Sequence, residues 1–293
     1  MKKNKFGIFL ILMIILSLSS QLFAQVNRML TISPTSYEAS VGNQSLVFRN
    51  PARNSFDLDT LSHVGFTRVD WLKNITEDMG YNYLQGSYKQ WSFDLLYFDY
   101  GSQKHSNESG IILGDFNPNS VVVSAGWGTQ LRDKVYAGVK GKLINHSLHT
   151  EKATGLVIDA GFFFPNLKIG NLNLEADVAI QNVGLAPKFN DFDSELPSSL
   201  NVGLSVPLKD FTLYEQYNIY DGYYTAGWGV DYNIKDIMKV RLGYFKDDTH
   251  DLSYPSLGLD FNYDRYLIGV GYIYGDEIHP LSNTFQLTIN IKI

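Results

Sequence analysis

The sequence predicts a transmembrane antiparallel β-barrel of about fourteen strands. Three observations lead to this fold class: hydrophobicity alternates with a period of two residues from His63 onward, short turns alternate with long polar loops, and aromatic residues and glycines are abundant. Of the 293 residues, 14% are aromatic and only 18% are charged, and 25 are glycine. This mixture is typical of twisted strands with aromatic girdles.

The beginning of the chain carries the features of a secretory signal. Lys2, Lys3 and Lys5 precede an apolar run over 6–18, and small and polar residues then lead to Ala24. The alternative is a signal-anchor helix, which needs roughly 20 apolar residues to span a bilayer, whereas this run has about 13. We therefore expect a signal peptide over 1–24. No later stretch is long and apolar enough for a spanning helix, so a mature membrane protein of this sequence has to be a barrel.

The alternation of side chains after His63 sets the expected strands. It is clearest over 225–234, where Ala226, Trp228 and Val230 alternate with Gly227 and Gly229. The expected strands run over 63–70, 79–89, 91–100, 119–131, 134–147, 154–165, 172–183, 198–207, 211–220, 225–234, 238–246, 255–263, 266–275 and 283–293. Most are near the 9 to 11 residues that a tilted strand needs to cross a bilayer.

The connections between these strands differ in length at the two ends of the barrel. Long polar connections follow odd-numbered strands, at 101–118, 184–197, 247–254 and 276–282, and short ones follow even-numbered strands, at 89–90, 132–133, 235–236 and 264–265. Outer-membrane barrels show this asymmetry, and an even strand count places both barrel ends at the short-turn, periplasmic rim. Residues 63–293 are therefore predicted to form a barrel in the cell outer membrane of a Gram-negative bacterium, with outer-membrane lipid around it.

The segment over 25–62 lacks the alternation of the barrel strands. Eight strands already enclose an interior that side chains fill, so about fourteen should leave a lumen that needs water or a plug. We expect this segment to be an N-terminal plug. The alternative is a disordered periplasmic leader.

Charged residues on the nominally inward face of the strands form a second prediction. A basic residue facing lipid at mid-depth costs roughly 2 to 4 kcal/mol, so an inward orientation is favoured. Their mixed signs predict ion pairs that neutralise the lumen wall, with a dedicated substrate site as the alternative. The predicted lumen-facing charges are Asp94, Lys140, Lys142, Asp159, Glu175, Asp177, Asp231, Lys239, Arg241 and Asp260.

Other features exclude several classes of function. The formal charge of −6 gives no basic excess for binding nucleic acid, and the absence of cysteine excludes a disulfide framework, a thiolate metal site and a lipoprotein anchor. No catalytic, cofactor-binding or metal-binding motif is present, so we expect no enzyme activity and no cofactor. Aromatic residues near strand ends are expected to form membrane-interface belts: Trp71, Trp91, Tyr97, Tyr100, Tyr217, Tyr220, Tyr223 and Tyr224.

Several short stretches occur in an order and spacing that resemble one family. They are Gly42, Asn50-Pro51-Ala52, Asp70-Trp71-Leu72, Tyr97-Phe98-Asp99-Tyr100-Gly101, Ile180-Gln181-Asn182-Val183-Gly184 and Asn283-Thr284-Phe285. Together they resemble the PorV/PorQ family of outer-membrane barrels, which are related to the FadL transporters of hydrophobic compounds. The resemblance covers most of the mature chain and implies a FadL-like barrel whose plug includes Gly42, Asn50, Pro51 and Ala52.

The resemblance also implies a function. Members of this family act in the type IX secretion system of Bacteroidota, where they bind or shuttle secreted cargo proteins and assist surface attachment together with other components of that system. The leading hypothesis is therefore a non-enzymatic barrel that binds cargo. The alternative is a FadL-like transporter for a hydrophobic small molecule, and a third possibility is a purely structural barrel.

Overall fold

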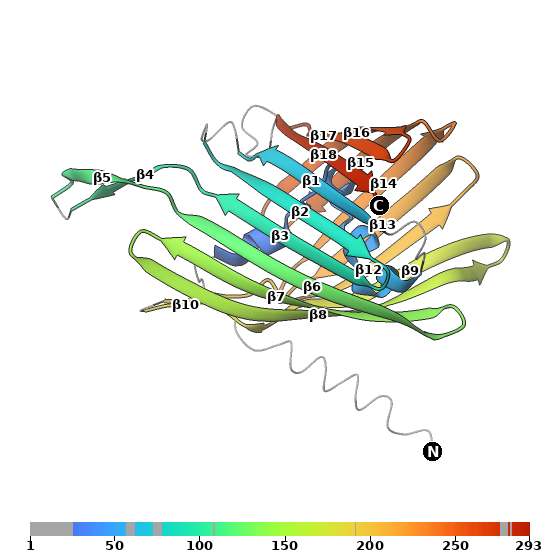
Figure 1. Cartoon of the computed structure of the whole chain (residues 1–293), viewed down its shortest axis with the longest axis horizontal. Coiled ribbons are helices and arrows are strands. Elements are labelled where there is room, and N and C mark those ends of the chain that lie inside the picture. The colour runs from blue at the N-terminus through green and yellow to red at the C-terminus, as the bar shows by residue number, and fades with distance from the viewer. Residues whose placement is uncertain are drawn as a thin grey trace, which may run out of the picture.

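Fourteen strands pair edge to edge around a closed antiparallel barrel, as the alternation of side chains predicts (Figure 1). The computed structural model describes residues 26–56, 62–72, 78–107, 109–190, 192–275, 281 and 283–293, so the signal peptide predicted for 1–24 lies outside the described residues. The barrel strands are β1 His63–Asp70, β2 Gly80–Tyr88, β3 Trp91–Asp99, β6 Asn119–Arg132, β7 Val135–Leu148, β8 Glu151–Ile169, β9 Leu172–Leu185, β12 Ser199–Pro207, β13 Phe211–Ile219, β14 Tyr224–Ile234, β15 Met238–Asp247, β16 Leu252–Tyr263, β17 Tyr266–Ile273 and β18 Thr284–Lys292. The last strand pairs with the first, His63 opposite Lys292, and this pairing closes the barrel and confirms the predicted fold class.

Two of the long polar connections contain strands of their own. Within 101–118, β4 Gln103–Ser106 pairs with β5 Ile112–Phe116, and within 184–197, β10 Lys188–Phe189 pairs with β11 Phe192–Asp193. Strand β8 is also longer than the predicted 154–165. Its pairing with β7 ends at Phe163, and beyond that residue it continues as a two-stranded hairpin with β9.

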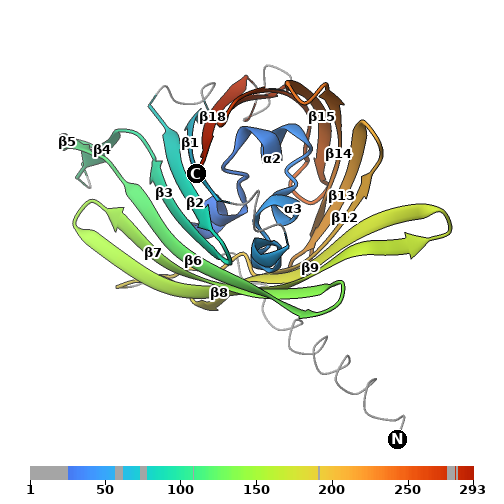
Figure 2. The same cartoon turned by 45° about the vertical axis from the view of Figure 1, so that its right-hand side comes forward.

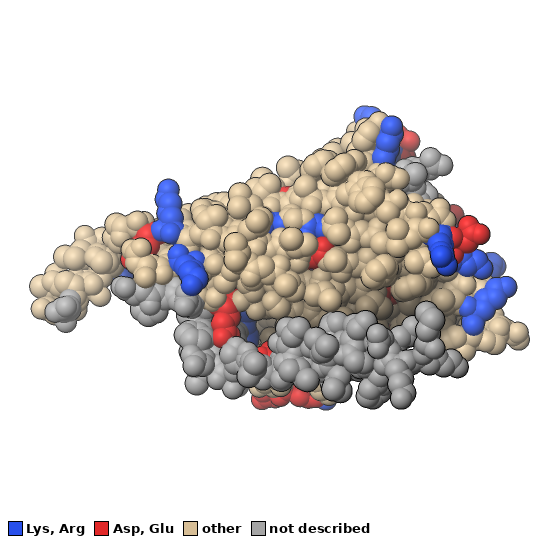
Figure 3. All heavy atoms as spheres, turned by 90° about the horizontal axis from the view of Figure 1, so that it is seen from below, with Lys and Arg blue, Asp and Glu red and all other residues tan. Residues whose placement is uncertain are grey.

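The outer face of the barrel is apolar all the way round. Each strand exposes at least one large apolar side chain to the outside: Phe66, Leu84, Phe93, Val123, Val139, Leu156, Ile180, Leu204, Leu213, Trp228, Leu242, Leu257, Ile268 and Leu287. On the face seen in Figure 3, acidic and basic residues lie mainly toward the two ends of the molecule. A closed barrel satisfies its backbone hydrogen bonds internally, so this apolar face suits the hydrocarbon of a bilayer.

The segment of residues 26–56, here called the inner segment, lies inside the barrel (Figure 2). It folds into four short helices, η1 Val26–Thr31, α2 Ser36–Ser40, α3 Ser45–Arg49 and η2 Pro51–Ser55. The side chain of Asn50 accepts a hydrogen bond from the backbone N–H of Ala52 (3.0 Å), and Pro51 occupies the first turn, so this local sequence starts η2. None of the described helices is long and apolar enough to cross a membrane.

Inward-facing glycines let the backbone of the inner segment approach the wall closely. A Cβ atom added to Gly227 would lie 2.0 Å from the Gly42 carbonyl oxygen, and one added to Gly138 would lie 2.3 Å from the Pro51 carbonyl carbon. These contacts fall into two groups, which we call the β14–β17 glycine seat (Gly227, Gly229, Gly243, Gly258, Gly269 and Gly271) and the β6–β8 glycine seat (Gly128, Gly138 and Gly161). Because most of the opposing atoms are backbone or sit next to it, a side chain at a seat position would displace the inner segment.

Candidate functional site

The inner wall of the barrel carries the predicted charges, and each of them forms an ion pair. Lys140 pairs with Asp94 (2.7 Å) and Lys142 with Asp159 (2.6 Å). The other predicted lumen-facing charges pair as Arg241 with Asp260, Lys239 with Asp231 (3.9 Å), and Glu175 and Asp177 with Arg53 (3.1 and 2.6 Å). The wall is therefore polar inside and largely neutral, which suits strands that are apolar on their outer face.

The pairing partners do not lie directly opposite each other on the sheet. Lys140 lies directly opposite Asp159, yet it pairs with Asp94, and Asp159 pairs with Lys142 two residues further along β7. Arg241 likewise lies opposite Asp231 and pairs with Asp260. Long side chains reach diagonal neighbours on one face of a sheet, so the ion pairs link several strands in sequence around the wall.

The inner segment is bound to this wall through a charge that the sequence did not single out. Arg53 donates to both oxygens of Asp177 and to Glu175, and its guanidinium carbon lies 3.9 Å from the centroid of the Phe163 ring. Asn50 donates to the Asp177 carboxylate (2.8 Å) and to the Phe162 carbonyl (3.0 Å). The side chain of Asp177 is fully buried, so these contacts hold η2 against β8 and β9.

The four predicted plug residues all lie in these contacts between the inner segment and the wall. Gly42 (φ +80°) rests on the β14–β17 glycine seat, and Pro51 rests on the β6–β8 glycine seat. Ala52 is buried with Tyr136 and Phe163, and Asn50 binds Asp177 as described above. The glycines of the wall were missed because the sequence does not show which of them meet the inner segment.

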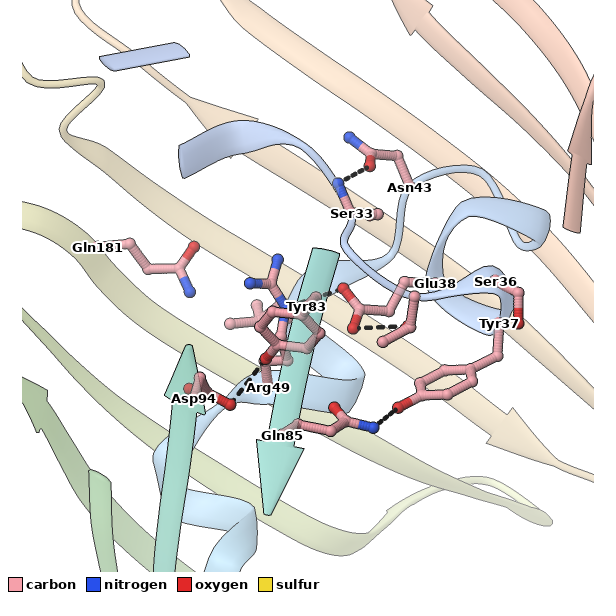
Figure 4. A network of polar contacts seen from close by, with 12 residues as sticks. Ser33, Ser36, Tyr37, Glu38, Asn43, Arg49, Tyr83, Gln85, Asp94 and Gln181 are labelled. Carbon is pink, nitrogen blue, oxygen red and sulfur yellow. Dashed lines mark hydrogen bonds and ion pairs between the residues drawn. The ribbon is translucent and has the colours of Figure 1, made fainter. Parts of the chain in front are cut away.

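A second buried charge pair lies within the inner segment itself (Figure 4). The Nε of Arg49 donates to Glu38 (2.8 Å), and the hydroxyl of Thr35 donates to the other oxygen of the same carboxylate (2.9 Å). Burial raises the pKa of the Glu38 carboxyl, and the neighbouring Arg49 cation opposes that rise. Nearby on the wall, the Tyr83 hydroxyl donates to Asp94 (2.7 Å). The centre of the lumen is thus filled by hydrogen-bonded polar groups.

On the long-loop side of the inner segment lies a cavity of about 420 Å³, which we call the long-loop cavity. Its wall is aromatic and aliphatic, with contributions from Trp71, Leu72, Phe245, Tyr254, Ile273 and Leu281. The rings of Phe245 and Tyr254 stack with centroids 5.1 Å apart. Ile32 and Ala39 of the inner segment also line it. An apolar molecule would lose its contact with water here without meeting an unpaired buried charge.

One edge of the long-loop cavity is polar. The Arg28 Nη2 and His250 Nε2 atoms lie 2.5 Å apart, and His250 Nδ1 lies 2.7 Å from the Asp247 carboxylate. The ring of Tyr223 stands edge-on to the His250 ring at 5.0 Å. These contacts join η1 to the loop between β15 and β16.

Two further spaces lie deeper in the lumen. A central pocket of about 50 Å³ is lined by Met29, Leu96 and Val122 and by the pairs Lys140–Asp94 and Lys142–Asp159. Below it, toward the short turns, is a cavity of about 370 Å³, which we call the short-turn cavity. Seven charged side chains line it, five of them basic, together with apolar surface from Tyr37, Phe56 and Leu267. Charged side chains are therefore more numerous at the short-turn end of the lumen than in the long-loop cavity.

The aromatic residues expected at the membrane interface divide between two positions. Trp91, Tyr97, Tyr217 and Tyr224 are exposed on the outside, as belt residues would be. Trp71, Tyr220 and Tyr223 line the long-loop cavity instead. Tyr100 lies inside the barrel, where it packs on Phe98 and accepts a hydrogen bond from the Ser120 hydroxyl. The period of two ends with the strand, so it does not determine which way a residue at a strand end points. Within the described residues there is no group of three His, Asp or Glu side chains placed to hold a metal ion.

The comparisons with known proteins identify the fold. No family model matches the sequence, and no curated protein matches it. Among solved structures, the toluene transporter TodX of Pseudomonas putida is 14% identical with a TM-score of 0.54, over 92% of this chain and 98% of that chain. The toluene transporter TbuX of Ralstonia pickettii is 11% identical with a TM-score of 0.55, over 87% of this chain and 96% of that one. A FadL homologue of Pseudomonas aeruginosa is 10% identical with a TM-score of 0.51, over 89% and 99%.

At these identities the likeness shows the fold, which is a FadL-like β-barrel. None of these solved structures is described as a PorV or PorQ protein, and none is described as an enzyme.

Proposed function

We propose that this protein is a transporter that lets a small hydrophobic molecule cross the outer membrane, with the inner segment as its plug. The observation that carries this proposal is the long-loop cavity, an aromatic and aliphatic space of about 420 Å³ between the inner segment and the wall. An apolar cavity of about 150 Å³ is enough to bind benzene, so a monoaromatic hydrocarbon fits with room to spare.

The structural neighbours support the same proposal. TodX and TbuX are described as toluene transporters, and their barrels share the fold of this chain. Cargo handling in type IX secretion, and with it an origin in Bacteroidota, gains no such support from these neighbours. The FadL-like transporter, introduced above as the alternative, therefore takes the place of the leading hypothesis.

The proposal is tested by filling the cavity. Leu252 at the start of β16 lines the long-loop cavity, whereas Leu257 on the same strand faces outward. The variant is expressed in cells that lack the wild-type protein. There Leu252→Trp is expected to lower toluene uptake on the order of tenfold, which corresponds to about 1.4 kcal/mol. Leu257→Trp makes the same substitution on the lipid side and should leave uptake unchanged.

Two results would contradict this proposal. The first is equal toluene uptake by wild type and Leu252→Trp. The second is a deletion strain that takes up toluene normally but no longer attaches secreted proteins to its surface, and this result would favour the secretion role.

A further inference from the structure

We propose that the long-loop cavity selects a monoaromatic molecule that carries a hydroxyl group, in preference to the bare hydrocarbon. This inference rests on the proposed function, because it names the class of substrate for the same cavity. Three uncharged polar side chains that line the cavity carry it, and we call them the neutral polar set: Ser33, Asn43 and Gln286.

Gln286 of β18 is the member of this set that comes from the barrel wall. Its side chain is 1% exposed and lines the cavity. Its amide oxygen is buried and has no hydrogen-bond partner among the described residues. A buried polar atom without a partner is uncommon, because it has given up its hydrogen bonds to water without replacement. Gln286 therefore points to a partner that the described part of the chain does not supply.

The other two members belong to the inner segment. Ser33 is 2% exposed, and its hydroxyl oxygen also has no hydrogen-bond partner among the described residues. The amide oxygen of Asn43 accepts a hydrogen bond from the backbone N–H of Ser33 (3.1 Å). The amide nitrogen of Asn43 points away from that contact (Figure 4) and donates to none of the described residues. The cavity is thus lined by both donor and acceptor groups that the rest of the described structure leaves unused.

The charged groups of the cavity are occupied with one another. Arg28, Asp247 and His250 form the contacts at its polar edge. A carboxylate or an ammonium ion would have to displace one of these contacts to find a partner of opposite charge, whereas a hydroxyl group needs only a neutral partner. Because a hydroxyl group both donates and accepts, it can pair with the amide nitrogen of Asn43 or with the amide oxygen of Gln286.

The remaining wall of the cavity suits an aromatic ring. The stacked rings of Phe245 and Tyr254 belong to one apolar cluster with Ile273 and Leu281. Toluene in this space would contact the apolar cluster but would keep water from the neutral polar set without offering it a hydrogen bond. A phenol with a single ring matches both parts of the lining. Hydrogen bonding to the neutral polar set therefore favours the phenol.

The test compares toluene with p-cresol, which is toluene with one hydroxyl group added to the ring. Each ligand is titrated into the purified full-length chain in a non-ionic detergent, and calorimetry gives its dissociation constant. Each ligand is compared between wild type and variant, so its partitioning into the micelles cancels. Wild type is expected to bind the two ligands in competition at one site.

Gln286→Leu keeps the approximate size of the side chain and removes the amide. It should weaken p-cresol binding by about five- to tenfold, which corresponds to the loss of one hydrogen bond, and should not weaken toluene binding. Replacing a buried polar group that has no partner by an apolar one is not expected to impair folding. The matched control is Gln130→Leu, because Gln130 is exposed near the end of β6 and lines none of the three lumen spaces described above.

A second pair of variants covers the case in which Gln286→Leu does not fold. Ser33→Ala removes the hydroxyl group of the inner segment and should weaken p-cresol binding several-fold. Ser36 is also fully buried, and its hydroxyl oxygen also lacks a partner among the described residues, but Ser36 does not line the cavity. Ser36→Ala is therefore the matched control and should change the binding of neither ligand.

The results separate this inference from the proposed function. Weaker p-cresol binding in Gln286→Leu and Ser33→Ala, with toluene binding retained, would support the hydroxyl preference. Equal changes for the two ligands, or no change for either, would overturn it, because water would then satisfy the neutral polar set as well as a hydroxyl group does. Binding of p-cresol that does not compete with toluene would also overturn it. The proposed function fails on a different result, which is wild-type toluene binding in Leu252→Trp.

Discussion

Gly138 on β7 offers a sharp test of whether the inner segment is held in a fixed seat. A Cβ atom at this position would lie 2.3 Å from the Pro51 carbonyl carbon and 2.4 Å from the Ala52 nitrogen. Ordinary contacts between such atoms begin near about 3.5 Å, so Gly138→Ala requires η2 to retreat by about 1 Å. Gly141 lies three residues further along the same strand, and a Cβ atom there would meet nothing within 4 Å. Gly141→Ala is therefore the matched control.

The magnitude follows from the cost of overpacking. Inserting a methyl group into a tightly packed contact costs about 1 to 3 kcal/mol. At about 1.4 kcal/mol per factor of ten, the opening equilibrium of η2 should rise roughly 5- to 140-fold in Gly138→Ala. Any gain from replacing a strand glycine by alanine is common to both variants and cancels in the comparison.

Hydrogen exchange measured by mass spectrometry on the folded protein reads this equilibrium directly. The informative amides are those of Ala52 and Arg53, which donate to the Asn50 side chain and to the Asn50 carbonyl. Faster exchange of these amides in Gly138→Ala than in Gly141→Ala is the expected result. If the two variants exchange within a factor of two of each other, the reasoning about the β6–β8 glycine seat is refuted.

Two further predictions concern the buried charges and the lipid-facing surface. Arg53→Met leaves the fully buried Asp177 without its cation, at a cost of about 3 to 5 kcal/mol, and should make the inner segment accessible to hydrogen exchange and protease. Adding Asp177→Asn should restore most of the protection. Wild-type protection in the single variant would contradict the role of the pair. Leu257→Arg places a cation near the middle of β16 on the lipid side and should destabilise the barrel in vesicles by about 2 to 4 kcal/mol in urea unfolding. Leu113→Arg, at an exposed position of β5 outside the barrel, should change stability by less than about 0.5 kcal/mol. Equal effects of the two arginines would mean that the face around Leu257 is not in lipid.

The candidate site was predictable from sequence only in part, and the ion pairs show why. The alternation of side chains places Lys140 and Asp159 on the inward face, because successive residues of a strand point to opposite sides. It does not show that Lys140 pairs with Asp94 across β6. That partner depends on which strands become neighbours and how they are staggered, and both are properties of the closed barrel.

The same limit applies to the residues that hold the inner segment. Arg49 and Arg53 stand in a stretch without regular periodicity, so no pattern in the sequence connects them with Glu38 or Asp177. The available signal of such contacts was that two arginines stand next to small polar residues in a segment expected inside a lumen. Gly138 and Gly141 look alike in the sequence, and only the path of η2 distinguishes them.

The sequence by itself determined the number of barrel strands, their approximate ends and the face that each strand turns outward. These properties are local, because the strand period of two and the composition of turns act over a few residues. Only the tertiary structure decided what fills the lumen, which charges pair, and that Trp71, Tyr220 and Tyr223 line a cavity and do not lie in a belt. Those outcomes depend on contacts between segments far apart in the chain, such as Arg53 with Asp177, and such contacts are set only when the barrel closes around the inner segment.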